Sequence, residues 1–171
     1  LTMTSRAGTG SQFTATFRLE LVTEVPAASV PQASTPRSGG LDILVAEDNA
    51  INRKLIALML EALGHKCTFA ENGEQAVSAA AAGSFDVIFM DVQMPVLDGL
   101  GATTRIRALN SPVAKTPIVA VTANAMSGDK EKYMAAGMDN YLSKPLSLQS
   151  LMKLFDELKI TPKAQGQRAA G

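Results

Sequence analysis

The sequence predicts an α/β fold, a doubly wound parallel sheet with helices on both faces. Three observations carry this prediction. Strand-like and helix-like segments alternate five times between residues 41 and 160. The strand-like segments are short apolar runs, which is typical of parallel strands buried on both faces. The connections between the segments are only a few residues long, as in consecutive βα units.

Five short runs are expected as strands, at residues 42–46, 66–70, 85–90, 117–121 and 140–142. The first and third contain the uninterrupted apolar sequences ILVA and VIFM, so we expect both to be buried on both faces. In the second run Cys67 alternates with Phe69. The pattern favours a buried structural thiol over a reactive one at Cys67.

The helices are expected at residues 50–63, 73–82, 100–109, 128–136 and 148–158. Asn49 and Ser147 precede the first and last of these segments, where their side chains can cap the free N–H groups of a helix. Glycines at positions 64, 83 and 137 follow the first, second and fourth segments and end those helices. His65, the only histidine, follows the first of these glycines and is interpreted as a turn residue.

The segments outside the alternating region have a different composition. Residues 12–22 alternate apolar and polar side chains, as in a strand with one apolar face, and this strand has no evident partner. Residues 23–40, rich in Pro, Ala, Ser and Gly, are predicted to be a flexible linker, and residues 161–171 a disordered tail. Because the chain begins with Leu1, we expect that it was cut from a longer polypeptide.

Composition excludes several classes of function. The 16 basic residues balance the 16 acidic ones, which argues against a nucleic-acid-binding surface. The single cysteine permits no internal disulfide, which fits a reducing compartment. No apolar run reaches the roughly 18 residues that span a bilayer, and no leader is evident. We therefore expect a soluble, cytoplasmic chain without membrane contact of its own, although its parent protein can be membrane-anchored.

Acidic residues follow two of the expected strands. Glu47 and Asp48 follow the first strand, and Asp91 follows the third. Loops after parallel strands form binding crevices in such sheets, so we expect these carboxylates at one rim. Like charges held close resist ionisation unless a cation joins them. A bound divalent metal is the simplest source of the positive charge that these acids require. Mg²⁺ is suitable, since it prefers few carboxylates and keeps several waters.

These residues suit phosphoryl transfer. A carboxylate is already ionised at neutral pH and can attack phosphorus without a general base. The step requires positive charge and hydrogen-bond donors at the phosphoryl oxygens. Lys144, just past the fifth strand, can bring an ammonium to the rim, and Thr122, after the fourth, can donate its hydroxyl.

Over residues 41–160 the sequence resembles the receiver domain of two-component response regulators. Five separated elements carry the resemblance: Glu47-Asp48, Asp91, Met94-Pro95 with Asp98-Gly99, Thr122-Ala123, and Lys144-Pro145. The resemblance implies a flavodoxin-like fold with five parallel strands in the order 2-1-3-4-5 and a site at the reversal of that order. Spacing and composition alone support only a doubly wound α/β sheet.

The resemblance also implies a role for each matching residue. Asp91 would accept the phosphoryl group in a reaction that the receiver itself catalyses, as it does the later dephosphorylation. Mg²⁺ would be bound by Asp48 and Asp91, by Glu47 through water and by the Gln93 carbonyl. Thr122 and Lys144 would contact the phosphoryl group. Tyr141 matches an aromatic switch position that turns inward as the threonine moves toward the phosphoryl group.

Two further segments are similar to receivers fused to hybrid histidine kinases. They are AEDN, followed by Asn52-Arg53, and VTANA. Within residues 1–22, the stretch GTGSQF and the following strand look like the last glycine box and closing strand of the kinase ATP-binding domain. We expect this remnant to be disordered and to bind no nucleotide, since the other boxes are missing. The donor histidine would lie elsewhere, in a kinase domain, and a histidine phosphotransfer protein would be the next acceptor.

Two alternatives stay open. A phosphatase of the haloacid dehalogenase class also uses an aspartate nucleophile, but its signature needs a second Asp where this chain has Gln93. A degenerate receiver would bind a partner without phosphorylation, which the intact acidic, Thr and Lys positions disfavour.

The helix at 50–63 has an apolar arc wider than a core requires. Either neighbouring elements cover this arc broadly, or an edge such as Leu58 or Leu60 receives a partner helix.

Overall fold

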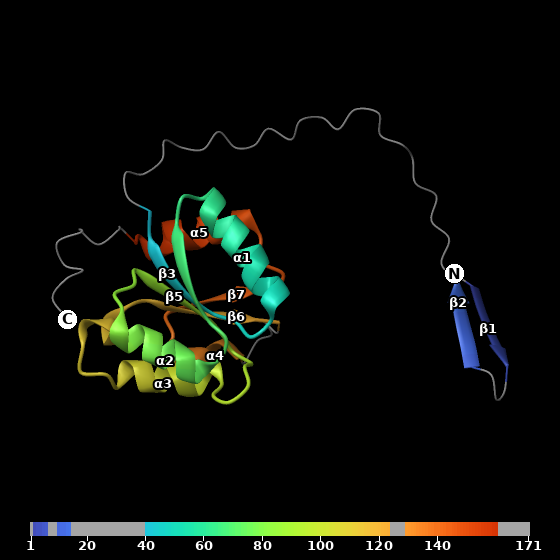
Figure 1. Ribbon diagram of the computed structural model, residues 1–171, viewed down its shortest axis with the longest axis horizontal. Coiled ribbons are helices and arrows are strands. Elements are labelled where there is room, and N and C mark those ends of the chain that lie inside the picture. Colours follow the sequence, from blue (N-terminus) through green and yellow to red (C-terminus); the bar gives the residue numbers. More distant parts are fainter. Residues whose placement is uncertain (1, 7–9, 15–39, 124–128, 161–171) are drawn as a thin grey trace, which may run out of the picture. The chain divides into compact units, whose positions relative to one another are not determined.

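The computed structural model describes residues 2–6, 10–14, 40–123 and 129–160 (Figure 1). The chain divides into two compact units, Leu1–Thr35 and Pro36–Gly171. Most of the predicted linker and the whole predicted tail lie outside the described residues. Among the described residues, no helix combines the length and apolar character that crossing a membrane requires.

The first unit contains a two-stranded antiparallel hairpin. Strands β1 (Thr2–Arg6) and β2 (Gly10–Thr14) pair with Met3 opposite Phe13. This corrects two expectations, a strand without a partner and a disordered start of the chain. The preceding segment supplies the backbone N–H and C=O groups that β2 needs, and its threonines favour extended structure. Residues 15–22 of the expected strand lie outside the described ranges.

The second unit contains a five-stranded parallel sheet in the order β4-β3-β5-β6-β7, which confirms the predicted order 2-1-3-4-5. The strands are β3 (Asp42–Ala46), β4 (Lys66–Ala70), β5 (Val87–Asp91), β6 (Ile118–Thr122) and β7 (Asn140–Ser143). Two of them reach further than the apolar pattern indicated. Asp91 pairs with Val121, and Thr122 pairs with Ser143, so backbone ladders carry both polar residues into the strand ends.

In the described part of this unit, four α-helices connect successive strands and a fifth follows the last strand: α1 (Ala50–Ala62), α2 (Gly73–Ala82), α3 (Gly99–Arg107), α4 (Asp129–Ala135) and α5 (Leu148–Leu158). The predicted caps are confirmed, since Asn49 accepts from the N–H groups of Ile51 and Asn52, and Ser147 from that of Ser150. Gly64 and Gly137 adopt positive φ after α1 and α4. A short 3₁₀ helix, η1 (Pro112–Lys115), was not predicted.

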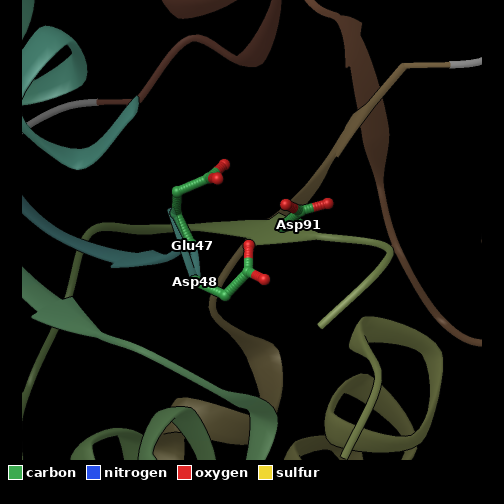
Figure 2. Close-up of side chains that lie close together, drawn as sticks. All are labelled: Glu47, Asp48 and Asp91. Atoms are coloured by element: carbon green, nitrogen blue, oxygen red, sulfur yellow. The ribbon is translucent and has the colours of Figure 1, made fainter. Parts of the chain in front are cut away.

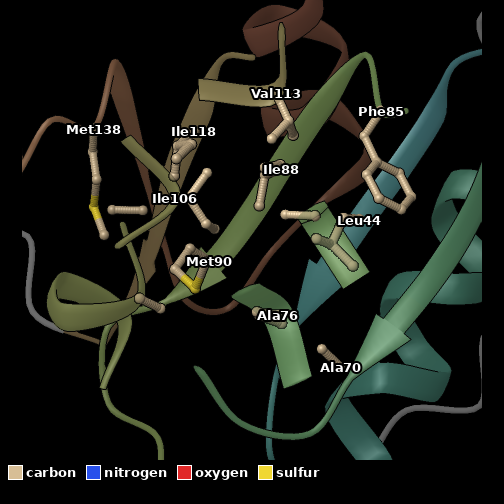
Figure 3. Packing of buried hydrophobic residues seen from close by; sticks show 14 of the residues in the cluster. Leu44, Ala70, Ala76, Phe85, Ile88, Met90, Ile106, Val113, Ile118 and Met138 are labelled. Carbon is tan, nitrogen blue, oxygen red and sulfur yellow. The ribbon is translucent and has the colours of Figure 1, made fainter. Parts of the chain in front are cut away.

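The helices cover both faces of the sheet (Figure 1). One core lies under α2, α3 and α4 and includes Leu44, Ile88, Ile118 and Ile106 (Figure 3). The other lies under α1 and α5 and includes residues of alternate parity from the same strands, such as Val45, Phe89 and Val119. We call these the α2–α4 core and the α1–α5 core. This burial on both faces is why β3 and β5 are continuously apolar.

The edge strand β4 is less buried than expected. Phe69 is 36% exposed, and Cys67 is half-buried against the α1–α5 core. Burial, followed by the nearby charge of Glu61, raises the pKa of the Cys67 thiol. His65 lies in the turn after α1, where its Nδ1 accepts a hydrogen bond from the Leu41 N–H at 3.2 Å. The turn interpretation of His65 is confirmed.

Candidate functional site

Three carboxylates meet at the carboxyl ends of β3 and β5. Glu47 and Asp48 directly follow β3, and Asp91 is the last residue of β5. These strands are neighbours in register, with Ala46 opposite Met90, so the acids lie side by side (Figure 2). One oxygen from each acid lies within 4.8 Å of the other two. Glu47 and Asp91 are buried, at 1% and 5% exposure, whereas Asp48 is exposed.

Lys144 places a positive charge between the two buried acids. Its Nζ lies 2.6 Å from Asp91 Oδ2 and 2.7 Å from Glu47 Oε2. Lys144 follows β7 and is joined to Pro145 by a cis peptide bond. Burial alone would lower the pKa of Lys144, but hydrogen bonds to Asp91 and Glu47 outweigh it and raise the pKa. Lys144 is therefore a permanent cation at neutral pH.

The pKa of Asp91 is raised above its ordinary value. Burial is the largest cause. The hydrogen bond from Lys144 and the one from the Gln93 N–H to Oδ1, at 3.0 Å, lower it in part, and the charge of Glu47 raises it again. Lys144 pairs with Glu47 and Asp91, and Asp48 adds a third carboxylate beside them, so the three acids outnumber the one ammonium paired with them. Oxygen ligands in this arrangement suit a hard divalent cation, so the residues fit the expected metal.

A glycine allows the chain to pass close to Asp91. A Cβ atom on Gly99 would lie 2.1 Å from the Asp91 carbonyl oxygen, and the Gly99 N–H donates to the Val92 carbonyl at 3.0 Å. Asp98 begins α3 beside it by accepting from the Gly101 N–H at 2.7 Å. The Asp98-Gly99 pair therefore shapes the loop that follows Asp91, while the Asp98 carboxylate caps a helix.

Of the remaining predicted residues, Thr122 and Gln93 lie at the same end of the sheet, and Tyr141 lies further back, in the first half of β7. Thr122 ends β6, is 5% exposed and belongs to the strand beside β5. Gln93 is exposed and contributes its N–H to Asp91. Tyr141 in β7 is half-buried against the α2–α4 core, with Lys130 Nζ 6.0 Å from its ring centre. Among the predicted site residues, ion pairs bring Lys144 into direct contact with Glu47 and Asp91.

Comparison with known proteins decides the family. Residues 43–156 match the model of the response regulator receiver domain. The chain belongs to this family. It is 48% identical over 113 residues to hybrid signal transduction histidine kinase G of Dictyostelium discoideum, a match that covers 65% of this chain and 3% of that protein. The chain spans between 3% and 14% of the length of curated relatives that it matches, which include hybrid and sensor histidine kinases.

Solved receiver domains have the same fold. One is the receiver domain of sensor histidine kinase PA1611 from Pseudomonas aeruginosa PAO1, with magnesium coordinated in its active-site cleft. It is 42% identical, with a TM-score of 0.64, and the match covers 70% of this chain and 97% of that one. Another is the Saccharomyces cerevisiae receiver domain of Ssk1 in complex with the phosphotransfer protein Ypd1, at 29% identity and a TM-score of 0.65, with 76% and 98% covered.

The receiver domain also contains supporting residues to which sequence reasoning gave no role. Asn52 Nδ2 donates to Glu47 Oε1 at 2.8 Å. The Arg53 guanidinium donates to the carbonyl oxygens of Glu47 and Asp48, at 3.0 and 2.8 Å, and pairs with Glu71 at 2.7 Å. These contacts hold the β3–α1 loop that carries two of the acids. Their signal was the Asn52-Arg53 pair, about one helical turn after the acids.

A groove of about 340 Å³ opens beside the acids of the receiver domain. It is lined by side chains from α1 and from the segment after β7: Glu47, Asn52, Leu55, Ile56, Lys144, Pro145 and Leu146. Ile51, Leu55 and Leu58 of α1 are exposed by 79%, 48% and 57%. The expectation of an exposed α1 edge holds for Leu58, but it is wrong for Leu60, which is fully buried in the α1–α5 core.

Proposed function

We propose that this receiver domain accepts a phosphoryl group from a phosphohistidine onto Asp91. The observation that carries the proposal is the Asp91 carboxylate, which is buried at a strand end, paired with Lys144 at 2.6 Å and grouped with two further acids. The carboxylate can act as the nucleophile, and the fixed cation beside it stabilises the negative charge on the oxygens of the transferred phosphoryl group. The similarity to the receiver domain of a sensor histidine kinase supports the proposal.

The acids would hold one Mg²⁺. Asp48 and Asp91 would each supply an oxygen, Glu47 would act through a water, and the Gln93 carbonyl would complete the protein ligands. The metal would neutralise charge that develops on the phosphoryl oxygens. Magnesium in the cleft of the related PA1611 receiver supports this choice of ion. Arg53 and Asn52, which bind the same loop, would orient the ligands.

The chain's own residues account for the rest of the transfer. An Asp91 oxygen attacks phosphorus, the P–N bond of phosphohistidine breaks, and its electron pair stays on the imidazole nitrogen. Lys144 keeps its proton, since its pKa is raised, and stays a counter-charge for the new acyl phosphate. Thr122, at the end of the neighbouring strand, would donate its hydroxyl to a phosphoryl oxygen. Tyr141 would follow the threonine as the switch residue.

The function is tested by incubating the protein with acetyl phosphate and Mg²⁺. We expect one acid-labile phosphate per chain, located by mass spectrometry in the peptide that contains Asp91, and none when a chelator removes Mg²⁺. Phosphate on another residue, or no phosphate under any condition, contradicts the proposal. Continuous hydrolysis of simple phosphomonoesters would instead indicate a phosphatase.

We also propose that a histidine phosphotransfer domain docks on the edge of α1 and passes or receives the phosphoryl group. The exposed Ile51, Leu55 and Leu58 form an apolar edge, and the groove that Leu55 helps to line extends from it to Glu47 and Lys144. A helix that buries this edge would bring its histidine to Asp91. The complex of the Ssk1 receiver with Ypd1 supports this class of partner.

Ile51→Glu is expected to weaken binding of a histidine phosphotransfer domain by at least about 10-fold, because it places a charge in an apolar contact. The fold should be unaffected, since Ile51 is 79% exposed and an acidic residue is favourable in the first turn of a helix. Met134→Glu in α4, a helix of the opposite core, is the matched control and should bind normally. Calorimetric titration measures both, and equal affinities would contradict the docking site. Equal partner affinity with and without beryllofluoride would favour a module that works without phosphorylation.

A further inference from the structure

A second tyrosine contacts Thr122. Tyr133 lies in α4, and its hydroxyl donates a hydrogen bond to Thr122 Oγ1 at 3.0 Å. Both residues are almost fully buried, with 4% of Tyr133 and 5% of Thr122 exposed. The proposed transfer uses the Thr122 hydroxyl but assigns nothing to Tyr133. The contact joins the end of β6 directly to a helix that covers the sheet.

The two strands show on which side this contact lies. Alternate residues of β6 face opposite cores, with Ile118 and Ala120 in the α2–α4 core and Val119 and Val121 in the α1–α5 core. Thr122 continues the first series, and its partner Tyr133 belongs to the same core. Asp91 continues the series of Val87 and Phe89, which face the α1–α5 core. Thr122 and Asp91 therefore leave the sheet toward opposite faces.

We propose that Tyr133 is a positioning residue that holds the Thr122 hydroxyl on the α2–α4 side and so opposes the phosphorylated state. This inference rests on the proposed function. For Thr122 to reach a phosphoryl group on Asp91, its side chain has to turn toward the other face, and that rotation breaks the hydrogen bond from Tyr133. Ending a buried hydrogen bond has a free-energy cost, so Tyr133 favours the unphosphorylated state.

The coupling works in both directions, because two linked equilibria affect each other equally. Phosphorylation at Asp91 would release the Tyr133 hydroxyl and, with it, a contact that ties α4 to the sheet. The Lys130 ammonium of the same helix lies 6.0 Å from the Tyr141 ring. Helix α4 thus contacts both residues that the phosphorylated state is expected to move.

The test is a double-mutant cycle with Tyr133→Phe, which keeps the ring and removes only the hydroxyl, and Thr122→Val, which keeps the shape and removes its acceptor. Calorimetry measures the affinity of the Mg²⁺-loaded protein for beryllofluoride, a mimic of the acyl phosphate. We expect Tyr133→Phe to bind beryllofluoride about 2- to 10-fold more tightly, the range for loss of one competing hydrogen bond. In the Thr122→Val background, Tyr133→Phe should change nothing, and Mg²⁺ affinity measured alone should be the same in all four proteins.

A second measurement excludes a packing effect of the substitution. The Thr122 methyl group, followed by NMR, should shift toward its beryllofluoride-bound position in Tyr133→Phe even without the anion. Equal or weaker beryllofluoride binding by Tyr133→Phe, or the same gain without the Thr122 hydroxyl, would overturn the inference while leaving the proposed function intact. If the unsubstituted protein fails to bind beryllofluoride with Mg²⁺, both are wrong.

Discussion

Asp91→Asn is expected to abolish phosphoryl incorporation and, at the same time, to stabilise the receiver domain at pH 7 in the absence of divalent cations. The amide is too weak a nucleophile to attack phosphorus, so the acid-labile phosphate should be undetectable. The stability gain follows from the raised pKa of Asp91, which shows that its burial disfavours the carboxylate and that Glu47 adds to this effect. We expect the Tm of the variant to be higher than that of the unsubstituted protein, because the neutral amide has no charge to bury.

The pH dependence of this difference has a defined sign. The unfolded chain releases the Asp91 proton near the ordinary pKa of 3.8, and the folded chain releases it at a higher pH. Between these values the folded state binds more protons than the unfolded state, so the unsubstituted protein loses stability as the pH rises through this window. Below both values Asp91 is neutral, and the gap to Asp91→Asn should close. Thermal unfolding between pH 3 and 8 measures this closure.

Asp98→Asn is the matched control. Asp98 is exposed and caps α3, and asparagine caps a helix about equally well. This variant should keep both phosphorylation and stability.

Saturating Mg²⁺ should make the unsubstituted protein more stable than Asp91→Asn, which reverses their order of stability. Binding to the folded state stabilises it by mass action, and the variant lacks one metal ligand. A destabilised Asp91→Asn without metal would contradict the interpretation of Asp91 as a carboxylate short of positive charge.

Lys144→Met is expected to have the largest effect on stability. It leaves Glu47 and Asp91 without the ammonium that lies within 2.7 Å of both. Removing one partner from a buried ion pair costs about 3 kcal/mol, because the remaining charge is uncompensated. Phosphorylation should also slow by about 100-fold or more, since the fixed cation at the phosphoryl oxygens is lost. Urea unfolding and the rate of labelling from acetyl phosphate measure these two effects.

Mg²⁺ should restore part of the stability of Lys144→Met, because it supplies positive charge to the same carboxylates. The stabilisation by Mg²⁺ should therefore be larger in this variant than in the unsubstituted protein.

The pKa of Lys144 is raised in the folded state. The contribution of its charge to folding stability is therefore complete below the ordinary pKa of 10.5 and is lost as the pH rises through the folded value. Lys153→Met, which removes an exposed lysine 3.7 Å from Glu157, should change stability little. Equal losses in both variants would contradict the central position of Lys144.

Local patterns were sufficient to predict most of the fold. The runs ILVA and VIFM are the central strands β3 and β5, and Asn49, Gly64 and Ser147 mark helix ends where expected. These signals are local, since caps depend on neighbouring residues and apolar runs reflect burial on both faces. The apolar pattern placed the ends of two strands one residue too early. Backbone pairing with the next strand extends β5 to Asp91 and β6 to Thr122.

The exposed faces were harder to predict. The wide apolar arc of α1 was recognised, but sequence alone did not distinguish the exposed Leu58 from the buried Leu60. The two residues differ by about 200° around the helix, and only the direction of the sheet decides which is covered. The same limit applied to the hairpin, whose first strand, Thr2–Arg6, has too little apolar alternation to be recognised without its partner.

The amino-acid pattern alone was enough to predict the order of strands and helices, the family, and the residue types available for chemistry at the strand ends. The contacts between distant groups became visible only in the folded chain: Lys144 reaches Asp91 across 53 positions, Arg53 binds the carbonyls of the acidic loop, and the Tyr133 hydroxyl donates to that of Thr122. This difference arises because propensity, capping and apolar periodicity act over a few residues, whereas these contacts depend on how strands pair and helices pack across the whole domain.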